Sequence, residues 1–136
     1  MFQTENFYYN RILEICQHFR SVLEHANNPP DYMKPFPVGW CGATSRALGG
    51  YLLSIGIRPI ERVCGYKAAL SHAWLEYENY IIDITADQFD DCDERVFVTT
   101  NRSYHNTFSN VKKRQICLED MNPYPEIWIV RVATQK

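Results

Sequence analysis

The sequence has no long apolar run and no excess of charge of either sign. No stretch approaches the ~18–20 apolar residues that a membrane-spanning helix needs, and no charged start leads into an apolar segment. Lysines and arginines number 14 against 16 aspartates and glutamates, a net charge of -2, which does not indicate a polyanion-binding surface. We therefore expect a soluble protein with no membrane and no nucleic acid partner.

Paired cysteines are also lacking. The five cysteines, at positions 16, 41, 64, 92 and 117, are odd in number and widely spaced, and no C-x-x-C occurs. This pattern argues against a disulfide framework and against a zinc knuckle. We expect a reducing compartment, the cytoplasm, and simple packing roles for Cys16, Cys64, Cys92 and Cys117.

Motifs for nucleotides and calcium are missing. Gly49 and Gly50 fit neither G-x-x-x-x-G-K-[ST] nor G-x-G-x-x-G, so close packing against another backbone is the better interpretation of this pair. The acidic stretch at 86–94 lacks the glycine and the ligand spacing of an EF-hand, which favours a solvated loop. The sequence thus predicts no cofactor and no metal.

The apolar pattern predicts one α+β domain over all 136 residues. Apolar side chains recur every three or four residues over 4–26 and about 41–55, as in amphipathic helices. Four of the seven prolines lie in 29–40, which should run extended. Short β-branched and aromatic runs follow at 60–67, 71–77, 80–85, 96–100 and 127–132. Helices first and strands afterwards indicate helices packed on an antiparallel sheet.

No structure is predicted for residues 101–125, which contain the basic cluster Lys112-Lys113-Arg114.

Cys41 lies where the proline-rich segment stops and the second predicted helix begins. The first N–H groups of a helix lack intrahelical partners, and the helix dipole is positive at that end. Cysteines so placed can have pKa values lowered to roughly 3.5–7.5. Cys41 is therefore the candidate nucleophile.

A histidine and a carboxylate follow on one predicted hairpin. A two-residue turn at 78–79 pairs Trp74 with Asp83. In that register one face carries Ala73, Leu75, Tyr77, Tyr80, Ile82 and Ile84. The opposite face carries His72, Trp74, Glu76, Ile81, Asp83 and Thr85, with the backbones of His72 and Asp83 roughly 7–8 Å apart on the diagonal. We expect the first face to be a core face and the second to be mixed and to carry the titratable groups.

These residue types suit nucleophilic catalysis by a thiol. His72 would take the proton from Cys41, and Asp83 would fix the tautomer and orientation of the imidazole. The backbone N–H of Cys41 and a second donor would stabilise the oxyanion at the helix start. The predicted substrate-binding or oxyanion residues are Trp40, Trp74 and Gln88.

At these residues the chain resembles a known family. A cysteine at a helix start, His-Ala-Trp-x-Glu on one strand and Ile-Asp-x-Thr on the next resemble the transglutaminase-like core of the papain-like cysteine-enzyme superfamily, over about residues 36–90. That superfamily includes cysteine peptidases, protein-glutamine deamidases, transglutaminases and arylamine N-acetyltransferases. The resemblance implies a papain-like fold in which Cys41 is the nucleophile, His72 the base and Asp83 the third member of a triad.

The expected function is therefore thiol-dependent hydrolysis of amide bonds in a protein or peptide substrate, as in a cysteine peptidase or a protein-glutamine deamidase. Three alternatives stay open: acyl transfer of the transglutaminase type, a binding module of the same fold without turnover, and a metal site built from Cys41, Cys64, His72 and Asp83. The resemblance extends to compact effector and toxin domains, so delivery into another cell is compatible with it. The oligomeric state is left open.

Overall fold

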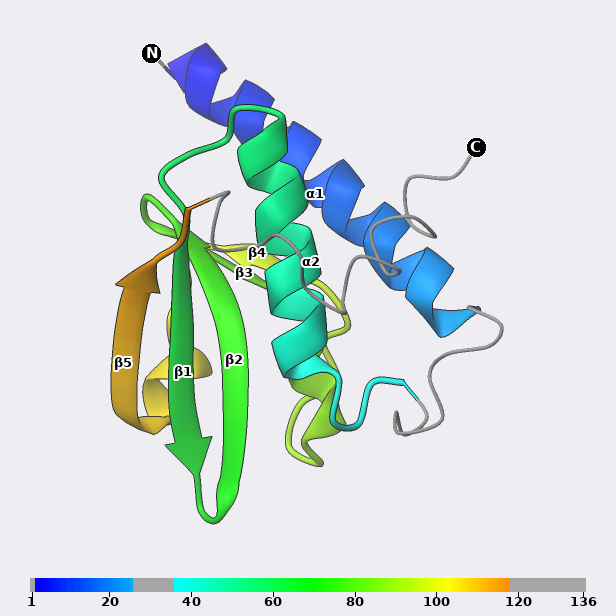
Figure 1. Ribbon diagram of the computed structural model, residues 1–136, viewed down its shortest axis with the longest axis vertical. Helices are drawn as coiled ribbons and strands as arrows, with labels where there is room; N and C mark the ends of the chain where they lie inside the picture. Colours follow the sequence, from blue (N-terminus) through cyan, green and yellow to red (C-terminus); the bar gives the residue numbers. More distant parts are fainter. Residues whose placement is uncertain (1, 26–35, 118–136) are drawn as a thin grey trace.

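Two helices pack on a five-stranded antiparallel sheet in the computed structural model, which describes residues 2–25 and 36–117 (Figure 1). The helices are α1 (Phe2–Glu24) and α2 (Cys41–Ser54), with single turns of 3-10 helix at η1 (Ala86–Gln88) and η2 (His105–Thr107). The strands are β1 (Glu61–Lys67), β2 (Leu70–Tyr77), β3 (Tyr80–Asp83), β4 (Phe97–Thr99) and β5 (Ser109–Gln115), in the spatial order β4-β3-β2-β1-β5.

The α+β class and the antiparallel sheet are confirmed, and both predicted helices agree with the observed ones to within two residues. The fifth strand is not the predicted one. Strand β5 lies in the stretch for which no structure was predicted, while the strand predicted at 127–132 and most of the proline-rich segment lie outside the described residues. The predicted loop at 86–94 contains η1.

The predicted register of the central hairpin is confirmed. Strand β2 pairs with β3 through Leu75 and Ile82, Glu76 and Ile81, and Tyr77 and Tyr80. Because side chains alternate along a strand, this register keeps Asp83 off the face of Leu75 and Ile82. A slip of one residue would instead point the carboxylate into the main core.

The main core lies between the helices and one face of the sheet. Helix α2 covers the middle of the sheet, and α1 crosses behind it toward β4 (Figure 1). Each fully buried aliphatic side chain contributes about 1.5–3 kcal/mol to folding. The largest fully buried side chains of this core include Ile12, Phe19, Leu48, Leu52, Leu75 and Ile82.

A close approach explains the first of the two glycines inside α2. A Cβ atom at Gly49 would lie 2.7 Å from Cδ1 of Ile116 and 3.3 Å from Cδ2 of Leu75. Gly49 is itself buried, so the helix can lie directly on β2 at this point. Close packing at Gly49 is therefore confirmed, but against side chains of Leu75 and Ile116 and not against the predicted second backbone.

The opposite face of the sheet is mixed and carries the titratable groups, as the hairpin pattern predicted, but it is covered. The segment that follows β3 folds across it, with η2 behind β1 (Figure 1), and closes a second, smaller core. This second core consists of Val63, Trp74, Ile81, Phe89 and Phe108. His72 and Asp83, 1% and 2% exposed, are therefore enclosed by aromatic rings.

No helix in the described part of the chain is both long enough and apolar enough to cross a membrane.

Candidate active site

Cys41 is the first residue of α2 and is half-buried. The chain enters the helix through a tight turn at 36–39, in which Gly39 has a φ of 80°, a conformation that favours glycine. The first turn of α2 contains no acidic side chain, and its cap residue, Trp40, provides no side-chain hydrogen bond. The positive end of the helix dipole is therefore not neutralised by a carboxylate in that turn, and an anionic sulfur there would be stabilised.

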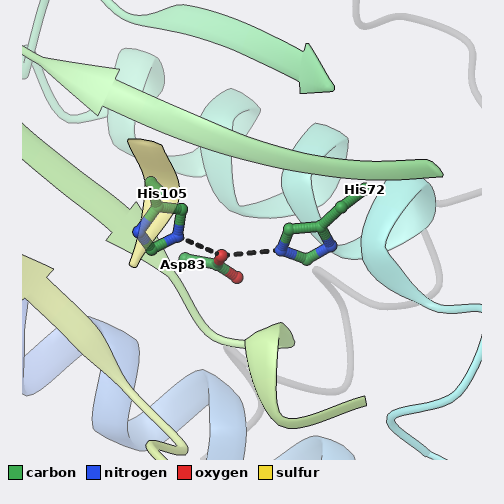
Figure 2. A group of neighbouring side chains, drawn as sticks. All are labelled: His72, Asp83 and His105. Carbon is green, nitrogen blue, oxygen red and sulfur yellow. Dashed lines mark hydrogen bonds and ion pairs between the residues drawn. The ribbon is translucent and has the colours of Figure 1, made fainter. Parts of the chain in front are cut away.

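His72 and Asp83 form the buried ion pair of the site (Figure 2). Nε2 of His72, near the start of β2, lies 2.7 Å from Oδ2 of Asp83, at the end of β3. The other carboxylate oxygen, Oδ1, accepts the backbone N–H of Thr85 at 3.0 Å. Asp83 therefore has both oxygens bonded, and Nδ1 is left as the nitrogen of His72 that faces away from the carboxylate.

A second histidine, which the sequence did not connect with Asp83, shares this carboxylate. Nε2 of His105 lies 2.7 Å from the same Oδ2 atom, on the side opposite to His72 (Figure 2). His105 is 3% exposed, and its Nδ1 has no hydrogen-bond partner. Two imidazole N–H groups that donate hydrogen bonds to the same oxygen would hold Asp83 in place from both sides.

Charge and burial shift the pKa values of both members of the pair. Burial alone would lower the pKa of His72, but the negative charge and hydrogen bond of Asp83, with a smaller effect of Cys41, raise it to about 9. Burial alone would raise the pKa of Asp83, but the two histidines hold it far below its ordinary value. At neutral pH the carboxylate is therefore ionised, and His72 can hold a proton.

The pKa of the Cys41 thiol is lowered despite its burial. Burial would raise this pKa, and a hydrogen bond and Coulombic attraction from His72 outweigh it, with further contributions from Gln88 and the backbone of Ala73. The pKa of the Cys16 thiol is raised by burial, as is that of Cys92. Cys41 is thus the cysteine whose surroundings favour the thiolate.

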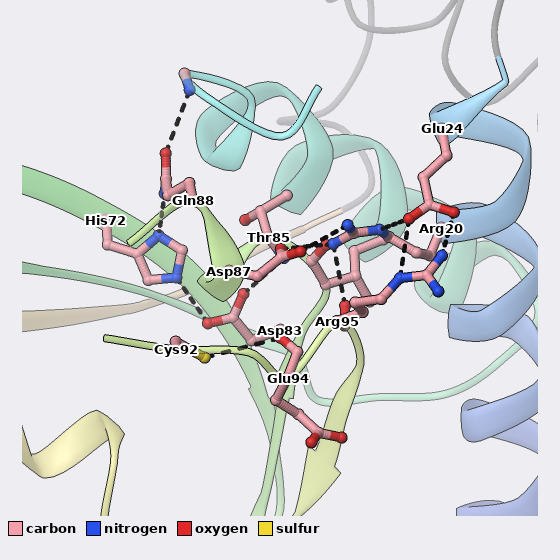
Figure 3. Close-up of polar contacts among 12 residues, drawn as sticks. Arg20, Glu24, His72, Asp83, Thr85, Asp87, Gln88, Cys92, Glu94 and Arg95 are labelled. Carbon is pink, nitrogen blue, oxygen red and sulfur yellow. Dashed lines mark hydrogen bonds and ion pairs between the residues drawn. The ribbon is translucent and has the colours of Figure 1, made fainter. Parts of the chain in front are cut away.

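Gln88 links the turn before Cys41 to the histidine (Figure 3). Its Oε1 accepts the backbone N–H of Gly39 at 3.2 Å, which leaves Nε2 as the donor 2.8 Å from Nδ1 of His72. When His72 is neutral, Nδ1 accepts this hydrogen bond and Nε2–H donates to Asp83, the tautomer that a base needs in order to take a thiol proton. When His72 is protonated, its free N–H can instead donate to the sulfur of Cys41. Gln88 therefore lies beside both reacting groups, where the sequence placed a candidate donor.

Arg20 fixes the segment that carries Gln88, a role that sequence reasoning missed. Its guanidinium binds both carboxylate oxygens of Asp87 at 2.7 Å and the carbonyl of Ile84 at 2.9 Å (Figure 3). The Nε–H donates to Glu24 at 2.8 Å. Breaking such a buried pair typically costs about 3–5 kcal/mol. Arg20 therefore ties η1 to α1 and positions Gln88.

Two predicted substrate-binding residues are placed elsewhere, and this corrects the prediction. The ring of Trp40 is 2% exposed and belongs to the main core, where it packs edge-on against Phe36. Trp74, also 2% exposed, lies in the second core with its ring 4.9 Å from that of His105, and its Nε1–H donates to Glu76. Both indoles are buried because the two faces of the sheet are covered, so they support the site without facing a substrate.

The structure also changes the set of residues that could form the alternative metal site. Within the described ranges, the group whose potential ligand atoms lie within 4.8 Å of one another is His72, Asp83 and His105, without Cys41 or Cys64. Two imidazoles and a carboxylate suit a transition metal such as Zn²⁺. The Nε2 atoms of both histidines, however, already lie at hydrogen-bond distance, 2.7 Å, from one carboxylate oxygen, so these three atoms form a proton-bearing network.

Comparisons of the chain with protein-family models, with curated proteins and with solved structures found no match.

Proposed function

We propose that the protein is a thiol-dependent amidohydrolase in which Cys41 is the nucleophile, His72 the general base and acid, and Asp83 the residue that orients the imidazole. The observation that carries this proposal is the position of His72. One ring nitrogen is bonded to a buried carboxylate, and the ring lowers the pKa of the thiol at a helix start. A surface histidine has no such pair of neighbours.

The proposed reaction begins with the thiolate of Cys41 attacking the carbonyl carbon of an amide. The negative charge moves to the carbonyl oxygen, where the backbone N–H of Cys41 and Nε2–H of Gln88 would donate to it. When the intermediate collapses, the C–N bond breaks, and the proton on Nδ1 of His72 goes to the departing amine. A thioester on Cys41 is left.

Water resolves the thioester. His72, now neutral, takes a proton from water, whose oxygen attacks the acyl carbon, and the C–S bond breaks to release a carboxylic acid and the thiolate. The amide attacked would be a peptide bond or a glutamine side chain of a protein or peptide. An amine in place of water gives acyl transfer, the alternative reaction of the same site. Catalysis requires that the Cys41 thiol stay reduced, and the reducing cytoplasm predicted from the cysteine pattern would keep it so.

The first test is selective alkylation. At pH 6.5, iodoacetamide is expected to modify Cys41 well before the other four cysteines, because only thiolates react and only Cys41 has both a helix N-terminus and an imidazole beside it. Peptide mass spectrometry after timed quenching gives the rate at each cysteine. Labelling of Cys41 no faster than that of exposed Cys117 would contradict the proposal.

Incubation with cell lysate followed by mass spectrometry of Cys41 would then identify a trapped acyl group, with Cys41→Ala as the control. Turnover that survived in Cys41→Ala and required a divalent cation would instead favour a metal site at His72, Asp83 and His105.

Gln88 offers a second test with a matched pair of variants. Gln88→Glu keeps an acceptor for the N–H of Gly39 but removes the donor, while Gln88→Ala removes both. Both variants are expected to form the acyl adduct about 10²–10³ times more slowly, as when one oxyanion donor is lost. Replacement of exposed Gln17 by alanine should have no effect. Acylation of Gln88→Ala at the wild-type rate would show that Gln88 does not stabilise the oxyanion.

A further inference from the structure

Strand β5 divides the basic cluster Lys112-Lys113-Arg114 between the two faces of the sheet. Nζ of Lys113 binds Oε1 of buried Glu76 at 2.9 Å, and the same carboxylate also binds Arg102. This is a structural contact on the face of the second core. Side chains alternate between the two faces along a strand, so Lys112 and Arg114 lie on the face opposite to that of Lys113. Farther along the sheet, α2 covers this same face.

One cation of β1, Arg62, meets them there. Across the β1–β5 ladder, Arg114 is opposite Arg62 and Lys112 is opposite Cys64. Like charges placed directly opposite each other destabilise a sheet. Helix α2 and strand β5 contain no aspartate or glutamate, and Glu61, the acidic residue of β1, alternates to the other face.

Within residues 2–25 and 36–117, two of these cations have no carboxylate partner. Arg62 donates Nε–H to the hydroxyl Oγ of Ser45 at 3.1 Å and Nη1–H to Sγ of Cys64 at 3.3 Å. Lys112 is exposed and forms no ion pair with any residue in 2–25 or 36–117. The chain as a whole is slightly acidic. This face therefore carries more positive charge than the average composition of the chain would give it.

The cationic face lies next to the nucleophile. Arg62 holds Ser45, one turn along α2 from Cys41, and a Cβ atom at Gly42 would lie 3.5 Å from its Nη2. Cys64 is paired with Ala73, whose backbone contacts the Cys41 thiol. The surface continues into a hollow of about 410 Å³, lined by Cys64, Tyr66, Asn110, Val111 and Lys112.

We propose that Arg62 and Lys112 form a subsite for an acidic segment of the substrate, so that a glutamate or aspartate near the reacting amide docks beside Cys41. The guanidinium of Arg62 would bind the carboxylate through paired N–H groups, and Lys112 would add a point charge at the rim. Half-exposed Tyr66, which lies beyond Lys112 along the ladder, provides apolar surface for the substrate chain. This inference rests on the proposed function, because the subsite serves the amide that Cys41 attacks.

The test measures binding of two fluorescein-labelled peptides, (Glu-Ala)₄ and (Gln-Ala)₄, to the Cys41→Ala protein by fluorescence anisotropy. The glutamate peptide is expected to bind at least about tenfold more tightly, with an advantage that shrinks between 50 and 500 mM salt. Lys112→Glu should weaken its binding about tenfold. Arg62→Gln, which removes the paired N–H groups of the guanidinium, should weaken it as well.

Arg11→Glu is the matched control, because it makes the same change of charge on an exposed residue of α1, the helix that contacts β4 at the opposite edge of the sheet from β5. Equal affinity for the two peptides, or equal losses in Lys112→Glu and Arg11→Glu, would overturn the subsite. Displacement of the glutamate peptide by lower concentrations of a single-stranded DNA 12-mer would also overturn it.

The alkylation test separates the two proposals. If Cys41 is selectively alkylated but the peptides bind equally, the proposed chemistry stands and the subsite is wrong. If the peptides bind as expected but Cys41 is not activated, the cationic surface is supported and the thiol chemistry is wrong.

Discussion

Replacing His72 with alanine is expected to slow alkylation of Cys41 at pH 6.5 by up to about a hundredfold, because a thiol with an ordinary pKa near 8.5 is only about 1% ionised there. In the wild-type protein His72 lowers the pKa of Cys41 against the effect of burial. The rate should be measured from pH 5 to 10, so that the loss appears as a shift of the titration to higher pH. Acylation by substrate should be lost altogether, since no proton donor remains for the leaving amine.

The pH dependence of the wild-type protein follows from the same pair. Acylation needs a thiolate and a protonated His72, whose pKa is raised to about 9. The rate of acylation should therefore rise through the lowered pKa of Cys41 and fall above about pH 9, whereas alkylation should not fall there. Replacement of exposed His25 by alanine is the control. An alkylation profile unchanged by His72→Ala would show that another group activates the thiol.

Asp83→Ala is expected to lower the free energy of unfolding by about 3–5 kcal/mol near pH 6, the usual result of removing one partner of a buried ion pair. The substitution leaves the Nε2–H groups of His72 and His105 without an acceptor in a site lined by aromatic rings. Urea unfolding monitored by fluorescence or circular dichroism gives the difference. Asp83→Asn, which keeps the shape and one carbonyl oxygen, should cost less.

The sign of the pH dependence distinguishes this effect from a general loss of packing. The pKa of Asp83 is depressed in the folded state, so its stabilisation is present above about pH 4 and is lost as the pH falls further. The pKa of His72 is raised, so its stabilisation is complete below about pH 6.5 and is lost as the pH rises through about 9. In Asp83→Asn the free energy of unfolding should depend less on pH than in the wild-type protein, both on the acidic side and on the alkaline side. Asp90→Asn, at an exposed position, should change neither.

The sequence by itself determined the hairpin and the helix start. Alternating apolar residues on two strands joined by a two-residue turn allow one register that buries them, and that register places Asp83 on the face of His72. The end of the proline-rich segment likewise fixed where α2 begins, and so placed Cys41 at its first residue. These are local patterns, in which neighbours in sequence decide the geometry.

Only the tertiary structure decided what surrounds those residues. Strand β5 gives no alternating signal because all seven of its residues are exposed, and it is held by backbone pairing with β1. His105 reaches Asp83 across 22 positions, and Arg20 reaches Asp87 across 67. The side chains at both ends of each pair are polar, and their positions follow no periodic pattern from which a partner could be predicted. Trp40 and Trp74 lie in cores for a related reason, since whether a sheet face is open depends on which distant segment folds over it.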